Sequence, residues 1–190
     1  ATLQLWICAF AERQYVKPTL IFRGSTGPRS KLPWPEEAAF YATLPNIRVT
    51  YQKNAWADEK FCEAEILEVA ADIRAAGVDG EVLIGMDNHS AQKTELMMGL
   101  YEALHMFPVL TAANCTDCIS PVDHHIGRHI QRHMGRSYQA AVEKDPHIWR
   151  ADHADQEIED SECASTMHRR MLMATWLDLA WADWCENHAY

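Results

Sequence analysis

The chain has no apolar stretch as long as the roughly 20 residues that a membrane-spanning helix requires. Its N-terminus also lacks the basic and then apolar plan of a secretory signal peptide. The chain has few basic residues: it contains 17 Lys and Arg and 27 Asp and Glu, which gives a net charge of −10. Surfaces that bind nucleic acid by charge alone usually carry an excess of Lys and Arg. These absences predict an intracellular protein with no membrane partner, and they argue against simple electrostatic binding to nucleic acid.

The acidity is concentrated in one segment. Six of the 27 acids lie between Ala151 and Glu162, where there is no Lys or Arg, so the rest of the chain is close to neutral. The simplest interpretation is a solvated loop. A regulatory tail that covers a basic groove is the alternative.

The chain contains enough hydrophobic residues to form the core of one domain. Of its 190 residues, 48% are hydrophobic and seven are Trp, which predicts a packed core. Six cysteines without a secretory signal predict reduced thiols and no disulfides. Six tryptophans could act as stacking platforms for bases, but most of them fall in predicted strands and helices, so we expect core packing for most; the six are Trp6, Trp34, Trp56, Trp176, Trp181 and Trp184. Trp34, in the loop LPWP, is the one that we expect to be exposed, where it could stack on a base.

Hydrophobic periodicity and turn residues divide the chain into alternating strands and helices. Asp58 is placed to cap a helix that Gly77 ends. The continuous apolar run 81–87 is typical of a strand buried on both faces, and Pro108 places its strand at a sheet edge. The predicted strands span 2–10, 18–23, 47–52, 81–87 and 106–112, and the predicted helices span 36–43, 58–76, 94–105, 121–143 and 165–185.

This order of elements predicts an α/β domain with a mixed sheet flanked by helices. We assign residues 1–145 to the domain. Residues 146–190 then form an acidic linker and a C-terminal helix that packs on the domain. An apolar face on that helix is made by Trp176, Leu177, Ala180, Trp181 and Trp184.

Two acids stand at positions that suit a metal site. Asp87 ends the apolar run VLIGMD, and Asp123 opens the helix in ISPVDHHIGRHIQ. A carboxylate at the end of a buried strand and another on a nearby helix are a common way to hold Mg²⁺ or Mn²⁺ for phosphoryl chemistry, where the ions stabilise the attacking and leaving oxygens.

Each acid also has a purely structural interpretation. Asp87 could begin an Asx turn at the end of its strand. Asp123 falls at the third position of a helix with Ser120 as N-cap and Pro121 at the first position, where any acid is stabilised by the helix dipole. The residues alone leave both interpretations open.

The segments around these acids resemble the DDE superfamily endonucleases, the catalytic domains of pogo-like and jerky-like transposases. The family's motifs lDNhsaH and pncTDllqPvD correspond here to MDNHSAQ and NCTDCISPVD, and the likeness covers most of the chain. The matching segments are 1–10, 18–24, 52–61, 86–92, 114–123 and 167–185.

This resemblance implies an RNase H-like fold and a Mg²⁺-dependent enzyme that cuts DNA and joins the freed 3′ hydroxyl to a target, with Asp87 and Asp123 as catalytic metal ligands. The family has a third acid, on a strand before the segment that begins at Ala1, so the chain resembles an N-terminally truncated domain. Glu12 and Asp58 do not lie where the motif puts that acid. Gln92 also stands where the family often has His. We therefore expect weak metal binding and no nuclease activity from this polypeptide alone.

The helix that begins near Pro121 separates into two faces. One is apolar, with Val122, Ile126, Ile130 and Met134 directed to the core. The other carries basic side chains that could follow a DNA backbone or could simply be solvated. These candidate nucleic-acid ligands are Arg128, Arg132 and Arg136, together with His89 beside Asp87, which could bind a phosphate or pack on the surface.

Two alternatives to a transposase fragment remain. The first is a non-catalytic module that binds nucleic acid or another protein. The second is a zinc-stabilised structural domain, in which Cys115 and Cys118 combine with His125, His129 and His133, although the spacing is shorter than in the usual finger. We favour the transposase fragment, with DNA as partner and a nuclear location, and leave open whether it forms homo-oligomers.

Overall fold

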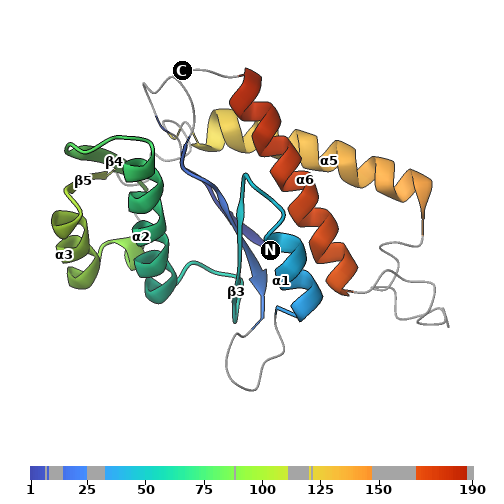
Figure 1. Ribbon diagram of the computed structural model, residues 1–190, viewed down its shortest axis with the longest axis horizontal. Helices are drawn as coiled ribbons and strands as arrows, with labels where there is room; N and C mark the ends of the chain where they lie inside the picture. The colour runs from blue at the N-terminus through green and yellow to red at the C-terminus, as the bar shows by residue number, and fades with distance from the viewer. Residues whose placement is uncertain are drawn as a thin grey trace.

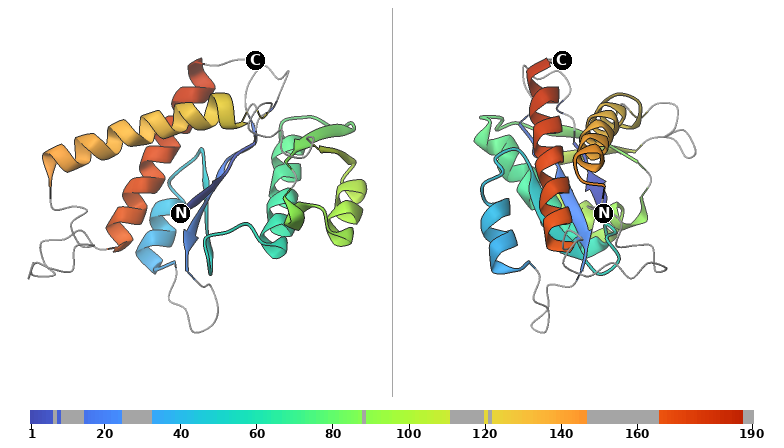
Figure 2. Two further views of the ribbon diagram at one scale, coloured as in Figure 1. Left: turned by 180° about the vertical axis from the view of Figure 1, so that it is seen from behind. Right: turned by 90° about the vertical axis from the view of Figure 1, so that its right-hand side faces the viewer.

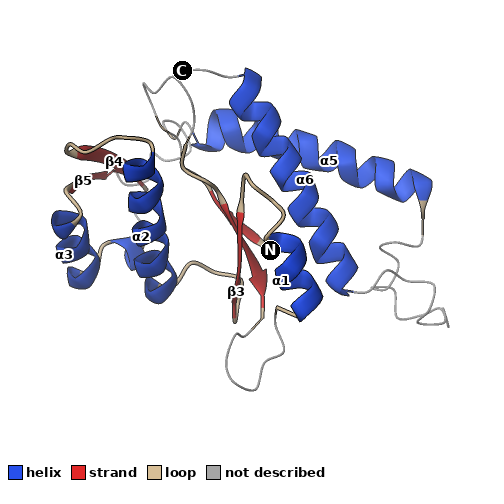
Figure 3. Ribbon diagram, viewed as in Figure 1, coloured by secondary structure: helices blue, strands red, loops and turns tan. Residues whose placement is uncertain are grey.

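The computed structural model describes residues 1–6, 8, 15–24, 33–87, 89–110, 120, 122–146 and 166–187. The elements are β1 (Thr2–Gln4), β2 (Thr19–Arg23), α1 (Pro35–Tyr41), β3 (Arg48–Gln52), α2 (Glu59–Ala75), β4 (Val82–Met86), η1 (Ser90–Gln92), α3 (Glu95–Ala103), β5 (Met106–Leu110), η2 (Val122–Ile126), α5 (Gly127–Lys144) and α6 (Thr166–Asn187). The predicted mixture of helices and strands is confirmed (Figure 3).

The strands form two sheets within the described ranges, where the sequence predicts one mixed sheet. In the first sheet, β1 runs antiparallel to β2 with Thr2 opposite Ile21, and β2 runs parallel to β3 with Leu20 opposite Val49. In the second, β4 and β5 are parallel, with Ile84 opposite Pro108. β1 and β4 are therefore both edge strands. Figure 1 shows α2 between the two sheets.

Helix α2 forms as predicted because its caps and its apolar spacing agree. The Asp58 side chain accepts a hydrogen bond from the Phe61 amide at 2.9 Å, and Gly77 follows the helix with φ of 83°, a conformation that favours glycine. The buried face of α2 contacts both sheets and α3 in one core. This first core includes Ile21, Phe61, Ile66, Val69, Ile84, Met86, Met97, Tyr101 and Met106.

The second core lies on the other part of the molecule, where α1, α5 and α6 cover the first sheet (Figures 1 and 2). The predicted apolar stripe of the α5 region is confirmed, since Ile126 and Ile130 are buried and Val122 and Met134 pack beside them. The five residues predicted to form the apolar face of α6 are also all buried.

A buried ion pair joins α1 to α6 in this second core. The Arg170 Nη2 and Nε atoms lie 2.6 and 2.7 Å from Oε1 of Glu37, which is fully buried. The Tyr51 hydroxyl donates to the same oxygen at 3.2 Å, and the Trp34 amide donates to Oε2 at 3.1 Å. Burial by itself would raise the pKa of Glu37, but the bonds from Arg170 and Trp34 outweigh it and hold the pKa below its usual value.

Two predictions about exposure are wrong. Strand β4 is buried on one face only, since Leu83 is 76% exposed and Gly85 is also exposed, because no described element covers the second face of the β4–β5 sheet. Trp34 is exposed, at 39%, as the sequence predicts, but Trp56 is 62% exposed, so the most exposed indole described is one that we expected in the core. Among the described helices, none combines the length and apolarity needed to cross a bilayer.

Candidate functional site

Asp87 lies on the surface directly after β4, as the sequence predicts. One of its carboxylate oxygens, Oδ1, accepts a hydrogen bond from the backbone amide of His89 at 3.2 Å. This is the Asx turn of the structural interpretation. The turn occupies one oxygen, and no described residue donates to the other. Asp87 can therefore hold its turn and still offer an oxygen to a cation.

Asp123 lies in η2, a single π-helical turn that leads into α5. The side chain of Asp123 is outside the described residues, as are Pro121 and the cysteines of the C-x-x-C segment. The turn depends on Gly127, because a Cβ atom there would stand 2.8 Å from the Val122 carbonyl oxygen. Single π-helical turns occur mostly inside α-helices and frequently at functional sites.

Replacing Gly127 by alanine is expected to destabilise the protein by about 1–3 kcal/mol, because the new methyl group overlaps a backbone oxygen and the turn has to shift. The matched control is Gly135→Ala on the same helix, where nothing lies within 4 Å of the added Cβ. That change is expected to stabilise by about 0.5–1 kcal/mol, since alanine favours a helix over glycine. Urea denaturation measures both. Equal effects at the two positions would show that the π turn is not under this constraint.

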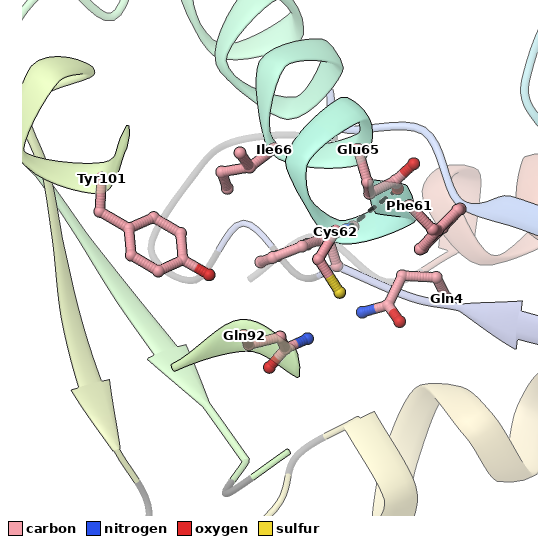
Figure 4. A pocket seen from close by; sticks show the side chains of 8 residues that line it. Gln4, Phe61, Cys62, Glu65, Ile66, Gln92 and Tyr101 are labelled. Carbon is pink, nitrogen blue, oxygen red and sulfur yellow. Dashed lines mark hydrogen bonds between the residues drawn. The ribbon is translucent and has the colours of Figure 1, made fainter. Parts of the chain in front are cut away.

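A pocket lies between β1 and η1, the segment that follows β4 (Figure 4). Glu65 lines it from α2 and is buried, with the Thr19 hydroxyl 2.9 Å from each of its carboxylate oxygens and Trp6 Nε1 3.3 Å from Oε1. Burial raises the pKa of Glu65, and the bonds from Thr19 reduce the rise. Its place among the apolar positions of α2 was the one sequence signal for this burial.

The pocket contains a thiol and an amide with distinct properties. Burial first, and then the negative charges of Asp58, Glu65 and Asp87, raise the pKa of the Cys62 thiol to about 11, so it is protonated and unreactive at neutral pH. The Gln92 Oε1 atom is shielded from solvent and accepts no hydrogen bond, which is costly for a buried polar group. Gln92 therefore has an acceptor available to a group that enters the pocket.

The three arginines predicted as DNA ligands lie on the exposed surface of α5. Arg128, Arg132 and Arg136 recur every four residues, so they share one face of the helix. His89 is half-buried next to Asp87, and its Nδ1 atom is shielded without a hydrogen-bond partner. The arginines lie on α5 and His89 lies in the turn after β4, so they come from different elements.

The histidines of the zinc alternative are used in part by the fold. His129 Nε2 lies 2.9 Å from Asp183 Oδ2, and the His129 ring meets the Trp184 ring with centroids 5.2 Å apart. His125 is exposed and His133 is half-buried. Across the part of the chain that the structure describes, no three His, Cys, Asp or Glu residues are grouped to hold a metal ion.

Sequence reasoning placed Trp56 in the core with most of the other tryptophans, but its side chain is exposed and lies beside the end of β4. Its ring centroid is 6.0 Å from that of His89, at an interplanar angle of 48°. The residue before it, Ala55, has φ of 52°, a left-handed conformation that is uncommon for residues other than glycine. No residue pattern in the sequence predicts this left-handed conformation at Ala55.

No protein-family model matches the chain, and neither a curated protein nor a solved structure does so.

Proposed function

We propose that the chain is a fragment of a Mg²⁺-dependent DDE transposase or endonuclease, whose complete form cleaves and joins DNA strands in the nucleus. In this proposal the fold is RNase H-like, and Asp87 and Asp123 are two of three acidic ligands for Mg²⁺ or Mn²⁺. The third acid belongs to a strand that is not among residues 1–190. The fragment alone then binds metal weakly and has no nuclease activity.

The observation that carries the proposal is the position of the two acids in their elements. Asp87 follows the last residue of β4 and is exposed, and one of its carboxylate oxygens accepts no hydrogen bond from the described residues. Asp123 stands in the π-helical turn that Gly127 permits. Carboxylates from a strand end and a helix start are suitable hard ligands for Mg²⁺, and single π-helical turns are frequent at functional sites.

The unpaired edges of the two sheets support a place for the third acid. Among the described strands, β1 pairs only with β2, and β4 pairs only with β5. The pocket between β1 and η1 contains the unpaired acceptor of Gln92. A further strand that paired with the free edge of β4 would bring an acid on it close to the end of β4, where Asp87 lies.

Calorimetric titration with Mg²⁺ and Mn²⁺ tests the proposal. The wild type is expected to bind weakly, and Asp87→Asn and Asp123→Asn are each expected to abolish binding because the two carboxylates share one cation site. Asparagine is the right substitution at Asp87, since its amide oxygen can still accept the His89 hydrogen bond and so preserves the turn.

The control is Asp79→Asn, which removes an exposed acid elsewhere and should leave metal binding unchanged. Binding that is equal in all four proteins, or absent from the wild type, contradicts the proposal. Mg²⁺-dependent nicking of DNA by the isolated chain would contradict its claim that the fragment is inactive.

A non-catalytic DNA-binding module is the second candidate, favoured by one observation. The basic face of α5 is exposed, as a surface that contacts phosphates would be. Salt-dependent DNA binding that survives both asparagine variants, but falls with Arg132→Ala and Arg136→Ala, would support this candidate over the transposase fragment.

A further inference from the structure

The loop between β3 and α2 holds one large aromatic side chain out in solvent. Trp56 is 62% exposed, whereas the residues on either side of it, Ala55 and Ala57, are buried. The Thr2 hydroxyl donates to the Ala55 carbonyl, and the Asp58 amide donates to the Trp56 carbonyl at 3.0 Å. The backbone on both sides of the indole is therefore fixed, and the exposed position of the ring is built into the loop.

The loop holds this position at a conformational cost. Ala55 adopts φ of 52°. Holding a residue with a Cβ in this region costs about 1–3 kcal/mol, so the conformation persists only where the surrounding structure imposes it. Such strain concentrates at ligand-binding positions. The turn also serves the fold, since Ala55 is buried and its amide donates to the Gln52 carbonyl at 3.0 Å, and the same turn leaves the indole of Trp56 in solvent.

The surroundings of Trp56 indicate what it binds. Its ring lies against that of His89, whose amide is bonded to Asp87, so the indole is next to the proposed metal ligand. Lys53, on the same loop, is exposed and forms no ion pair among the described residues. Polar and charged exposed neighbours do not make the contiguous apolar patch that a protein partner would need. These exposed neighbours of the indole instead suit a nucleotide, in which a flat base is joined to a phosphate.

We propose that Trp56 is a stacking platform for a nucleobase of a DNA strand whose phosphate lies toward Lys53. The choice of DNA as ligand rests on the proposed function. Stacking on an indole tolerates any base, because every base has a π face. Trp56 thus positions the strand beside the metal site without reading its sequence.

The test is the affinity of the purified chain for a fluorescently labelled single-stranded DNA oligonucleotide, measured by anisotropy at low salt. Trp56→Ala is expected to weaken binding by about 5- to 150-fold, the loss that corresponds to one base stack. Trp56→Tyr, which keeps an aromatic ring, should restore most of the affinity. Trp34→Ala, at a second exposed indole among the described residues, should leave the affinity within about 3-fold of the wild type. Thermal unfolding confirms that each variant is folded.

An oligonucleotide without bases separates stacking from charge. The wild type should bind it as weakly as Trp56→Ala binds the normal strand. The inference is overturned if the wild type binds no single strand, if Trp56→Ala binds normally, or if Trp34→Ala loses as much affinity. Metal titration remains a separate measurement: loss of the stack with intact metal binding refutes only the role of Trp56, and absent metal binding with an intact stack refutes only the transposase proposal.

Discussion

Glu37→Ala is expected to lower the free energy of unfolding by about 3–5 kcal/mol, the cost of removing one partner of a buried ion pair. The substitution leaves the Arg170 guanidinium, whose side chain is only 12% exposed, without its carboxylate. It also removes the acceptor of the Tyr51 hydroxyl. Urea denaturation followed by circular dichroism measures the change.

The adjacent residue provides the control. Glu36 is exposed on the same helix, so Glu36→Ala should change stability by less than about 1 kcal/mol. Removing both partners, as in Glu37→Leu with Arg170→Met, should cost less than the sum of the single changes, because no charge is then left unpaired. If Glu37→Ala is no more harmful than Glu36→Ala, the ion pair does not hold α6 in place.

The same pair makes stability depend on pH. The pKa of Glu37 is lower in the folded protein than its ordinary value, so the unfolded chain takes up a proton first on acidification. The contribution of Glu37 is complete above the unfolded pKa of about 4.3 and is lost as the pH falls through the folded value. Glu37→Gln should remove this part of the acid sensitivity while the remainder persists.

Trp181→Ala is expected to destabilise the protein by about 3–5 kcal/mol, through lost burial and the cavity that remains. Trp181 is 4% exposed and packs in the second core, with Leu20 and Phe22 of β2 and Ile126 and Ile130 of the α5 region. A change of this size approaches the whole stability of many domains. Differential scanning calorimetry measures the shift in melting temperature.

Leu179, two residues away on the same helix, is 53% exposed and is the matched control. Leu179→Ala should alter stability by less than about 0.5 kcal/mol. Similar losses at the two positions would mean that α6 contributes helical structure but no specific packing, and the assignment of its buried face would be wrong.

The sequence predicts those elements in which local signals agree. Helix α2 has a capping aspartate, a regular apolar stripe and a terminal glycine, and it lies within two residues of its predicted bounds. α6 follows from its apolar face in the same way. The position of Asp87 at a strand end is likewise local, and so is the Asx turn that it forms.

Features that depend on distant parts of the chain could not be predicted. The apolar run of β4 indicates a strand, but it does not say whether anything covers the face that carries Leu83. In the sequence, Glu37 is an ordinary acid at the start of a helix, and nothing near it indicates that Arg170 of α6 pairs with it. The exposure of Trp56 follows from the backbone of Ala55, a residue with no preference for that conformation.

The contacts of α6 also determine when this protein can fold during its synthesis. Glu37 and Arg170 are separated by 133 residues, and the Asn46 amide is bonded to Asp178 across 132. Until α6 has been synthesised, Leu20 and Phe22 lack the part of the second core that α6 supplies, and this face of the first sheet is only partly covered. Closure over such sequence distances is slow, so the second core is completed late in folding, when α6 joins the rest of the domain.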